Sequence, residues 1–286
     1  MIKKILVTIA LLVVTPLTFA TPERIISAEG SLTEIVYALG EEKRLVGVDT
    51  TSRHPEIATE LPQIGYMRNL SAEGSLSLAP DAMIASDRSG PPRIINQISQ
   101  AGVRVEQYKA EPTLEGVRIK IEGVAALLDK KEAGQVLWEK VSQEVKKARL
   151  RVANIAKPVR VLFMFSTQGN SPVVGGSNTE ADAMISMAGG INVAAEVNGY
   201  KPMTTEAIVD ARPDVILMMT RGGNHTVTPE DIFNKPGLAQ TPAARNNRLV
   251  AMDGLYLLGF GPRIGQAISD LSREFYPELL VSLQEE

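Results

Sequence analysis

Short apolar segments alternate with amphipathic, helix-like segments along both halves of the chain. The apolar segments predict strands at residues 24–27, 45–48, 82–85, 103–108, 159–165, 215–219 and 249–251. The amphipathic segments predict helices at residues 31–39, 91–101, 180–188 and 263–275. This alternation is typical of βαβ units and indicates an α/β fold with mostly parallel sheets.

One longer helix is expected between these two α/β series. Across residues 130–155, apolar side chains recur every three or four positions, and the other positions are rich in Lys, Glu and Arg. The pattern predicts an apolar stripe on a helix of roughly 25 residues, about 37 Å long at 1.5 Å per residue. We expect Lys157 and Pro158 to end this helix, because proline cannot continue one.

Two distant segments share one arrangement. Glu73 and Glu206 each open a short helix seven residues before a Pro-Asp turn that leads into a strand. The repeat predicts two similar α/β lobes joined by the long helix. The expected organisation is a signal peptide at residues 1–20, an N-terminal lobe at 21–129, a linking helix at 130–156 and a C-terminal lobe at 157–286. The same unit is common in α/β proteins, and Ser71 and Thr204 as N-caps would explain both glutamates by capping and the helix dipole alone.

The first twenty residues have the features of a secretory signal peptide. Lys3 and Lys4 precede an apolar run at residues 5–14, and residues 18–20 form a small-x-small cleavage site. The run is shorter than the ~20 apolar residues that a membrane-spanning helix needs. No Cys follows it, which excludes a lipoprotein anchor. We therefore expect cleavage near Ala20 and a mature protein in the periplasm of a Gram-negative bacterium.

Composition narrows the possible chemistry. The 286 residues are 44% hydrophobic, enough for a large core, and include no Cys and only two His. Disulfides, iron–sulfur clusters, thiolate metal sites and His-rich metal sites are thereby excluded. The net charge of −3 gives no sign of nucleic-acid binding. A nucleophile elbow and a phosphate-binding loop are both missing from the sequence, so a binding protein is favoured over the alternative, a secreted α/β enzyme.

The most informative candidate residues are Tyr66, Met67 and Arg68. They lie in a loop expected at the end of the sheet, where α/β folds bind ligands. An arginine beside a tyrosine favours the phenolate, which is a hard ligand for ferric iron and a known axial ligand of haem. An ordinary half-buried aromatic remains the alternative for Tyr66. His54 and His225 also lie in expected loops, where histidines are usually only solvated.

The chain resembles the periplasmic haem-binding proteins of bacterial haem ABC importers, which are class III periplasmic binding proteins. The resemblance extends over essentially the whole mature chain. Its Tyr-x-Arg motif followed by Leu-Ser-x-Glu-Gly is fairly specific to haem binders, whereas the lobe-helix-lobe pattern is shared with cobalamin and ferric-siderophore binders. It is carried by residues 24–40, 46–52, 66–81, 178–185 and 188–192.

This resemblance implies two Rossmann-like lobes joined by one long backbone helix, with ferric haem as the transported ligand in the cleft between them. Tyr66 would be the axial ligand of the haem iron, and Arg68 would stabilise its phenolate. Met67 would lie in the same pocket. From the C-terminal lobe, Arg221 would bind a haem propionate or the ligand tyrosine, the alternative being an ordinary surface arginine.

Some members of this family carry a histidine in the loop that corresponds to residues 166–172. Here Gln168 and Asn170 stand in that loop, and both are poor ligands for ferric iron. We therefore expect Gln168 to support the pocket without binding iron, and one five-coordinate haem.

The resemblance also gives Glu73 and Glu206 a role beyond capping, as carboxylates that dock against arginines of a dimeric permease. The implied partners are an inner-membrane ABC permease and ATPase and, upstream, an outer-membrane haem receptor. A monomer that is not an enzyme is expected. A ferric-siderophore or cobalamin carrier remains the alternative, with a secreted haem-processing enzyme as a more distant one.

Overall fold

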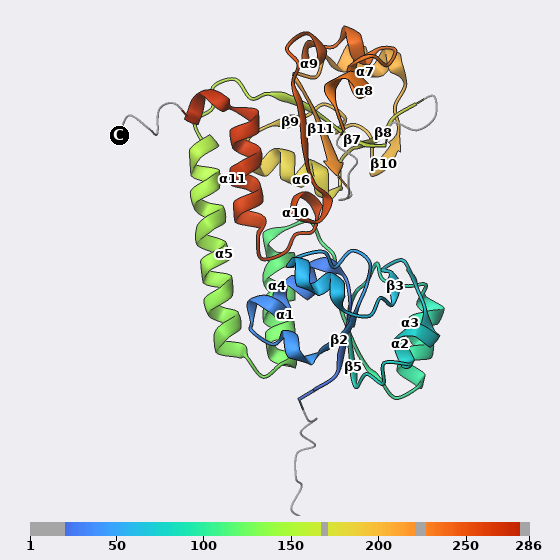
Figure 1. Ribbon diagram of the computed structural model, residues 1–286. Helices are drawn as coiled ribbons and strands as arrows, with labels where there is room; N and C mark the ends of the chain where they lie inside the picture. The colour runs from blue at the N-terminus through green and yellow to red at the C-terminus, as the bar shows by residue number, and fades with distance from the viewer. Residues whose placement is uncertain (1–20, 167–170, 221–226, 281–286) are drawn as a thin grey trace, which may run out of the picture.

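Two sheets organise the computed structural model, which describes residues 21–166, 171–220 and 227–280 (Figure 1). The strands are β1 (Ile25–Ala28), β2 (Leu45–Val48), β3 (Gly65–Tyr66), β4 (Asn69–Leu70), β5 (Ala82–Ser86), β6 (Arg104–Tyr108), β7 (Arg160–Ser166), β8 (Val173–Gly175), β9 (Ile191–Asn192), β10 (Tyr200–Pro202), β11 (Val215–Thr220) and β12 (Leu249–Asp253). The helices are α1 (Gly30–Ala38), α2 (Ala72–Leu76), α3 (Pro92–Gln100), α4 (Leu114–Leu127), α5 (Lys131–Val152), α6 (Glu180–Met187), α7 (Thr205–Ala211), α8 (Pro229–Phe233), α9 (Pro242–Arg245), α10 (Gly254–Leu258) and α11 (Ile264–Phe275).

The N-terminal lobe comprises a parallel sheet of order β2-β1-β5-β6 and helices α1 to α4. The central strands β1 and β5 are buried along their whole length, which explains their continuous apolar sequences. One face of the sheet shares a core with α1 and α4, through residues such as Ile25 and Ile121. The other face shares a core with α2 and α3, through residues such as Ile26 and Ile98.

The C-terminal lobe comprises a mixed sheet and helices α6 to α11. The strand order is β10-β8-β7-β11-β12, with β9 beside β7. Strands β9, β11 and β12 run parallel to their neighbours, whereas β8 and β10 are antiparallel additions. The sequence pattern, which predicts mostly parallel sheets, does not indicate these short antiparallel strands.

The long helix α5 runs along one side of both lobes, where it packs against α4 in one lobe and α11 in the other (Figure 1). The predicted apolar stripe is confirmed in the second half of the helix, where Val141, Val145 and Ala148 are each 1% exposed. It is wrong near the start of the helix, where Val136 is 67% exposed. Gly265 lets α11 approach closely, since a Cβ atom there would lie 2.5 Å from Cβ of Glu144. The helix ends at Val152, three residues before the expected end.

Every predicted strand and helix is present, and the strand and shorter helix ends lie within two residues of those expected. Helix α4 is the main element that the sequence pattern does not predict. Its amphipathic pattern is inverted at two neighbouring positions, because Lys120 is 1% exposed while Ile119 is 40% exposed.

In the ranges that the structure covers, no helix is both long enough and apolar enough to cross a bilayer.

Candidate ligand-binding cleft

A cleft of about 920 Å³ lies between the two lobes. Its walls include residues just after the carboxyl ends of β1, β2, β5 and β6 in one lobe, and residues at the ends of β7 and β11 and just after β12 in the other. Ligands of α/β proteins bind at this end of the sheet. The volume is within the range of sites that enclose an organic ligand of drug size or larger.

A short hairpin, β3–β4, presents Tyr66 to the cleft. The hairpin is anchored at both ends by buried side chains, because Ile64 is 0% and Leu70 is 5% exposed. Tyr66 itself is 44% exposed and lines the cleft. The hairpin is therefore fixed to the core of the lobe, while the phenol of Tyr66 remains accessible in the cleft.

Backbone contacts fix the hairpin further. The amide of Gly90 donates to the carbonyl of Met67 at 2.8 Å, and the amide of Leu70 donates to the carbonyl of Gly90 at 2.9 Å. Gly65 has a φ of +104°, and a Cβ atom there would lie 2.8 Å from the carbonyl oxygen of Asn69. Only glycine adopts this turn without strain.

Arg68 lies at the tip of the same hairpin and also lines the cleft. Its charge acts on Tyr200, which belongs to the opposite lobe. Burial raises the pKa of Tyr200, and hydrogen bonds at residues 179 and 181 together with the charges of Arg88 and Arg68 partly offset this rise. The hairpin thus brings a cation close to the aromatic residue that faces it.

The C-terminal wall of the cleft is largely apolar and aromatic. Tyr200 packs against Phe165, with 5.4 Å between the ring centroids. Other apolar members of this wall are Met219, Leu255, Leu258 and Phe260. An aromatic wall opposite a phenol suits a large, flat, mostly apolar ligand.

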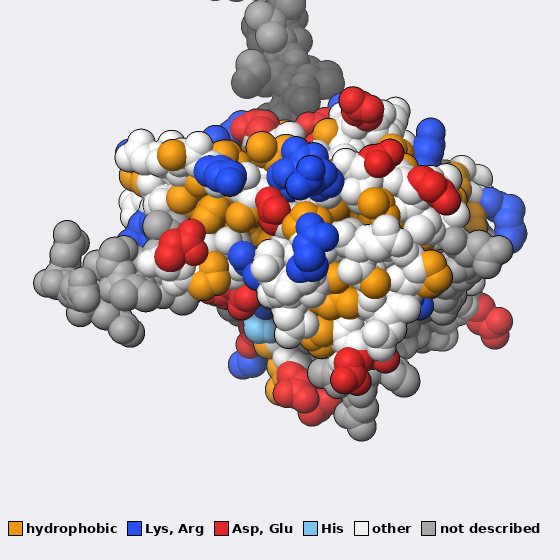
Figure 2. Space-filling model, turned by 90° about the horizontal axis from the view of Figure 1, so that it is seen from above, with side chains coloured by type: hydrophobic (Ala, Val, Ile, Leu, Met, Phe, Trp, Pro, Cys, Tyr) orange, Lys and Arg blue, Asp and Glu red, His pale blue; other side chains and the backbone are white. Residues whose placement is uncertain are grey.

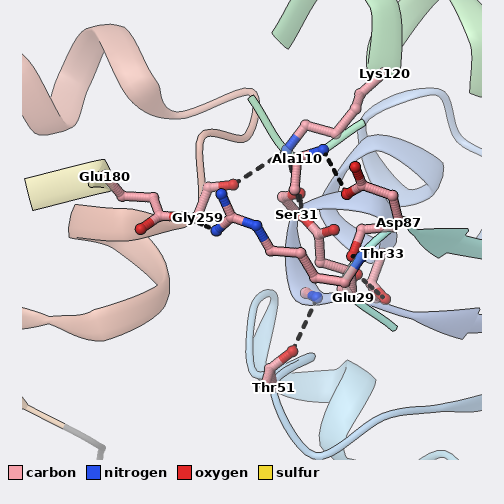
Figure 3. Close-up of polar contacts among 12 residues, drawn as sticks. Glu29, Ser31, Thr33, Thr51, Asp87, Ala110, Lys120, Glu180 and Gly259 are labelled. Carbon is pink, nitrogen blue, oxygen red and sulfur yellow. Dashed lines mark hydrogen bonds and ion pairs between the residues drawn. The ribbon is translucent and has the colours of Figure 1, made fainter. Parts of the chain in front are cut away.

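Two polar clusters connect the lobes at the cleft (Figure 3). At its floor, Nζ of Lys120 lies 2.8 Å from Oγ of Ser31, 3.2 Å from the carbonyl oxygen of Gly259 and 3.3 Å from Oε1 of Glu29. Burial raises the pKa of Glu29, but the charge of Lys120 and the interactions with the side chains of Ser31, Ser86 and Lys120 outweigh it, and the pKa is lowered. Glu29 is therefore ionised at neutral pH, and the floor is an ion pair.

The second cluster crosses the cleft between the walls. Arg88, in the segment after β5, forms an ion pair with Glu180, the first residue of α6. The hydroxyl of Tyr200 donates to Oε2 of the same carboxylate at 3.0 Å. All three residues line the cleft.

The structure brings Tyr66, Met67 and Arg68 together in the cleft, as the sequence indicates. Gln168 and Arg221, the other expected pocket residues, lie outside the described residues, as does His225. His54 is exposed, and the lining of the cleft does not include it.

Glu73 and Glu206 are both exposed in the first turns of α2 and α7. The hydroxyls of Ser71 and Thr204 cap these helices, which confirms the expected N-caps. Figure 1 shows α2 and α7 on different lobes, both on the side away from α5.

Sequence reasoning missed the polar clusters. Glu29 directly follows β1. Its position at the carboxyl end of a predicted strand could have identified it as a candidate residue of the cleft. Lys120 was hidden inside the unpredicted helix α4, and the pairing of Arg88 with Glu180 depends on how the lobes face each other. Among the described residues, no group of three or more His, Asp and Glu side chains could hold a metal ion.

Solved structures of known proteins share this fold at high similarity. The apo form of the periplasmic haem-binding protein RhuT from Roseiflexus sp. RS-1 is 42% identical, with a TM-score of 0.85, over 90% of this chain and 99% of that one. The periplasmic haem-binding protein BhuT in complex with two haems is also 42% identical, with a TM-score of 0.84, over 90% and 98% of the two chains.

Curated sequences give more distant relatives. A vitamin B12-binding protein from Vibrio parahaemolyticus is 26% identical over 256 residues, which are 88% of this chain and 89% of that protein. A family model described as periplasmic binding protein matches residues 25–255. The chain therefore belongs to the periplasmic binding protein family.

Proposed function

We propose that this protein binds haem in the cleft between its lobes and delivers it to an ABC transporter of the inner membrane. The observation that carries the proposal is the β3–β4 hairpin, which holds the accessible phenol of Tyr66 and the guanidinium of Arg68 at the cleft. The 42% identity to haem-binding structures supports haem over cobalamin, for which the relative is 26% identical.

In this proposal Tyr66 is the axial ligand of ferric haem and Arg68 favours its phenolate form. Met67 contacts the ring beside the ligand. Gln168 and Arg221 lie outside the described residues, and we propose supporting roles for them at the pocket. We propose one five-coordinate haem, although the similar BhuT structure holds two.

The transporter partner is proposed to contact the two lobes through Glu73 and Glu206. Figure 2 views the end of the molecule that carries α7, α8 and α9, where acidic side chains are scattered among basic and apolar ones. Such exposed pairs contribute little energy and act mainly on orientation.

The protein is proposed to reach the periplasm through the signal peptide at residues 1–20, with cleavage near Ala20. The lobe limits given above, 21–129 and 157–286 with the helix at 130–156, are part of the same proposal. We further propose that the carrier works as a monomer, receives haem that an outer-membrane receptor has imported, and releases it unchanged.

A hemin titration followed by absorbance tests the ligand. We expect saturation at one hemin per protein, with the high-spin spectrum of a tyrosinate-bound ferric haem, and no saturation with cyanocobalamin or a ferric siderophore. Extraction of the bound pigment should return intact haem. Saturation by cyanocobalamin without saturation by hemin would overturn the proposal, and two bound hemins would correct the stoichiometry.

A further inference from the structure

The ion pair between Arg88 and Glu180 crosses the cleft where a ligand has to lie. The two residues come from different lobes and both line the cleft. Figure 3 shows the carboxylate of Glu180 joined by a dashed line to the guanidinium that reaches it from the other lobe. A ligand that fills the space between the walls must therefore pass, displace or replace this contact.

The pair is more accessible than the ion pair between Arg263 and Glu34, which also joins the two lobes. The side chains of Arg88 and Glu180 are 38% and 14% exposed, against 24% and 5% for Arg263 and Glu34. A partly exposed pair exchanges partners at low cost, whereas breaking a buried pair leaves an unpaired charge. The Arg263–Glu34 pair and the hydrogen bond from Lys120 to the carbonyl of Gly259 can thus hold the lobes together while the contact across the cleft opens.

The charges on the two walls differ in sign. On the N-terminal wall, the cations Arg53, Arg68, Arg88 and Lys120 outnumber the carboxylates Glu29 and Glu111, whereas the charged residues described on the C-terminal wall are Glu180 and Asp253. A ligand with free carboxylates is attracted to the arginines and repelled by Glu180. Replacing the Glu180 carboxylate on Arg88 by a carboxylate of the ligand exchanges one charge-assisted hydrogen bond for another.

Glu180 keeps a partner when Arg88 leaves it. The hydroxyl of Tyr200 donates to Oε2 of Glu180, while the guanidinium is bound to Oε1. Tyr200 also packs on Phe165, so this acceptor stays fixed to the aromatic wall. Each carboxylate and each cation therefore has a partner both before and after the exchange.

We propose that Arg88, Glu180 and Tyr200 form a latch across the empty cleft, and that a carboxylate of the bound ligand replaces Glu180 on Arg88. This inference rests on the proposed function, because haem carries two propionate carboxylates that can make the exchange. The latch favours tetrapyrroles with free carboxylates over corrinoids whose side chains are amides. On release of the ligand the pair re-forms, which favours the return of the empty carrier.

A double-mutant cycle in hemin affinity tests the exchange. We expect Arg88→Gln to raise the hemin Kd about tenfold, the value of one charge-assisted hydrogen bond. We expect Glu180→Gln to lower the Kd about threefold, because Arg88 is then free before the ligand arrives. In the Arg88→Gln background, the gain from Glu180→Gln should be clearly smaller, because only the repulsion between Glu180 and the ligand is then removed. Arg93→Gln, an exposed arginine on α3, is the matched control and should bind hemin like the wild type.

An equally large gain from Glu180→Gln in the Arg88→Gln background would mean that Glu180 only repels the ligand, and would overturn the latch. A loss of affinity in Glu180→Gln alone would also overturn it. Hemin dimethyl ester lacks free carboxylates and cannot replace Glu180 on Arg88, so it should bind Arg88→Gln at least as tightly as the wild type. A loss of ester affinity in Arg88→Gln like that of hemin would overturn the exchange.

Thermal unfolding without ligand separates this inference from the proposed function. In the empty protein, Arg88→Gln and Glu180→Gln should lower the Tm non-additively, and saturating hemin should remove that coupling. Additive effects in the empty protein would overturn the latch whether or not hemin binds. Failure of the wild type to bind hemin, with coupling present, would overturn the proposed ligand instead.

Discussion

The guanidinium of Arg263 donates two hydrogen bonds to the carboxylate of Glu34, from Nε at 2.9 Å and from Nη2 at 2.6 Å. Glu34 belongs to α1 in the N-terminal lobe, and Arg263 precedes α11 in the C-terminal lobe. The guanidinium also lies 4.8 Å from the centre of the Tyr256 ring. With Lys120 at the cleft floor, this bidentate pair gives the lobes a second fixed connection.

Removing one partner of this pair should destabilise the protein. Glu34 is 5% and Arg263 24% exposed at the side chain. Glu34→Gln leaves a largely desolvated cation, so we expect a loss of about 2 kcal/mol in the free energy of unfolding by urea. Arg263→Lys loses the planar fork and should cost about 1 kcal/mol.

The matched control is Arg273→Lys in the exposed pair with Asp270 on α11. It should change the free energy of unfolding by less than about 0.5 kcal/mol. If Arg263→Lys were as harmless as this control, the pair would not be a significant connection between the lobes.

The ion pair at the cleft floor predicts a pH dependence of stability. The folded-state pKa of Glu29 lies below its ordinary value of 4.5, so the unfolded chain binds the proton more readily. The contribution of Glu29 is fully present above pH 4.5 and is lost as the pH falls through the lowered folded-state pKa. Wild-type stability should therefore fall more steeply below pH 4.5 than that of Glu29→Gln, measured by urea unfolding between pH 7 and 3.

Glu73→Gln, at an exposed position, serves as the control for this comparison and should follow the wild-type curve. Parallel curves for wild type and Glu29→Gln would show that the Lys120 charge does not act on this carboxyl as the structure indicates.

Elements with a local sequence pattern could be predicted, whereas the ionic contacts between the lobes could not. Strands such as β5 and the stripe of α5 follow from local hydrophobic periodicity, because a single face or a whole segment is buried. The candidate ligand residues could be recognised because they lie next to one another in one short hairpin, at Tyr66, Met67 and Arg68. Arg88 and Glu180 are 92 positions apart. Their contact depends on the orientation of two lobes, which no local pattern encodes.

Tyr66 should account for most of the haem affinity. Tyr66→Phe keeps the ring and removes the oxygen that would bind iron. Loss of a supporting group around a metal ligand already costs 10–100-fold, so we expect removal of the ligand itself to raise the hemin Kd about 100-fold. The visible spectrum should lose its tyrosinate character, and Tyr37→Phe on α1 should leave both properties unchanged. Equal affinity in Tyr66→Phe and the wild type would contradict the ligand assignment.

The hairpin predicts a second, indirect effect on affinity. In Gly65→Ala, the left-handed φ and the 2.8 Å approach to the carbonyl of Asn69 should together destabilise the protein by about 2 kcal/mol. The shift of the hairpin should also raise the hemin Kd several-fold. Gly102→Ala isolates the backbone strain, because Gly102 has a φ of +93° and open space around its Cβ position. It should cost about 1 kcal/mol and leave hemin affinity unchanged. The same Kd change in both variants would mean that hairpin geometry does not set affinity.

Docking to the transporter can be separated from haem binding through Glu73 and Glu206. Both carboxylates are exposed, and neither caps its helix, because the caps are the hydroxyls of Ser71 and Thr204. The double variant Glu73→Gln with Glu206→Gln should therefore preserve folding and hemin affinity. The haem-loaded double variant should stimulate the ATPase of the reconstituted transporter less than the wild type does, with a smaller difference at high salt. Glu132→Gln with Glu274→Gln removes two other exposed carboxylates and should stimulate normally. Equal stimulation by both double variants would show that the transporter contacts the lobes elsewhere.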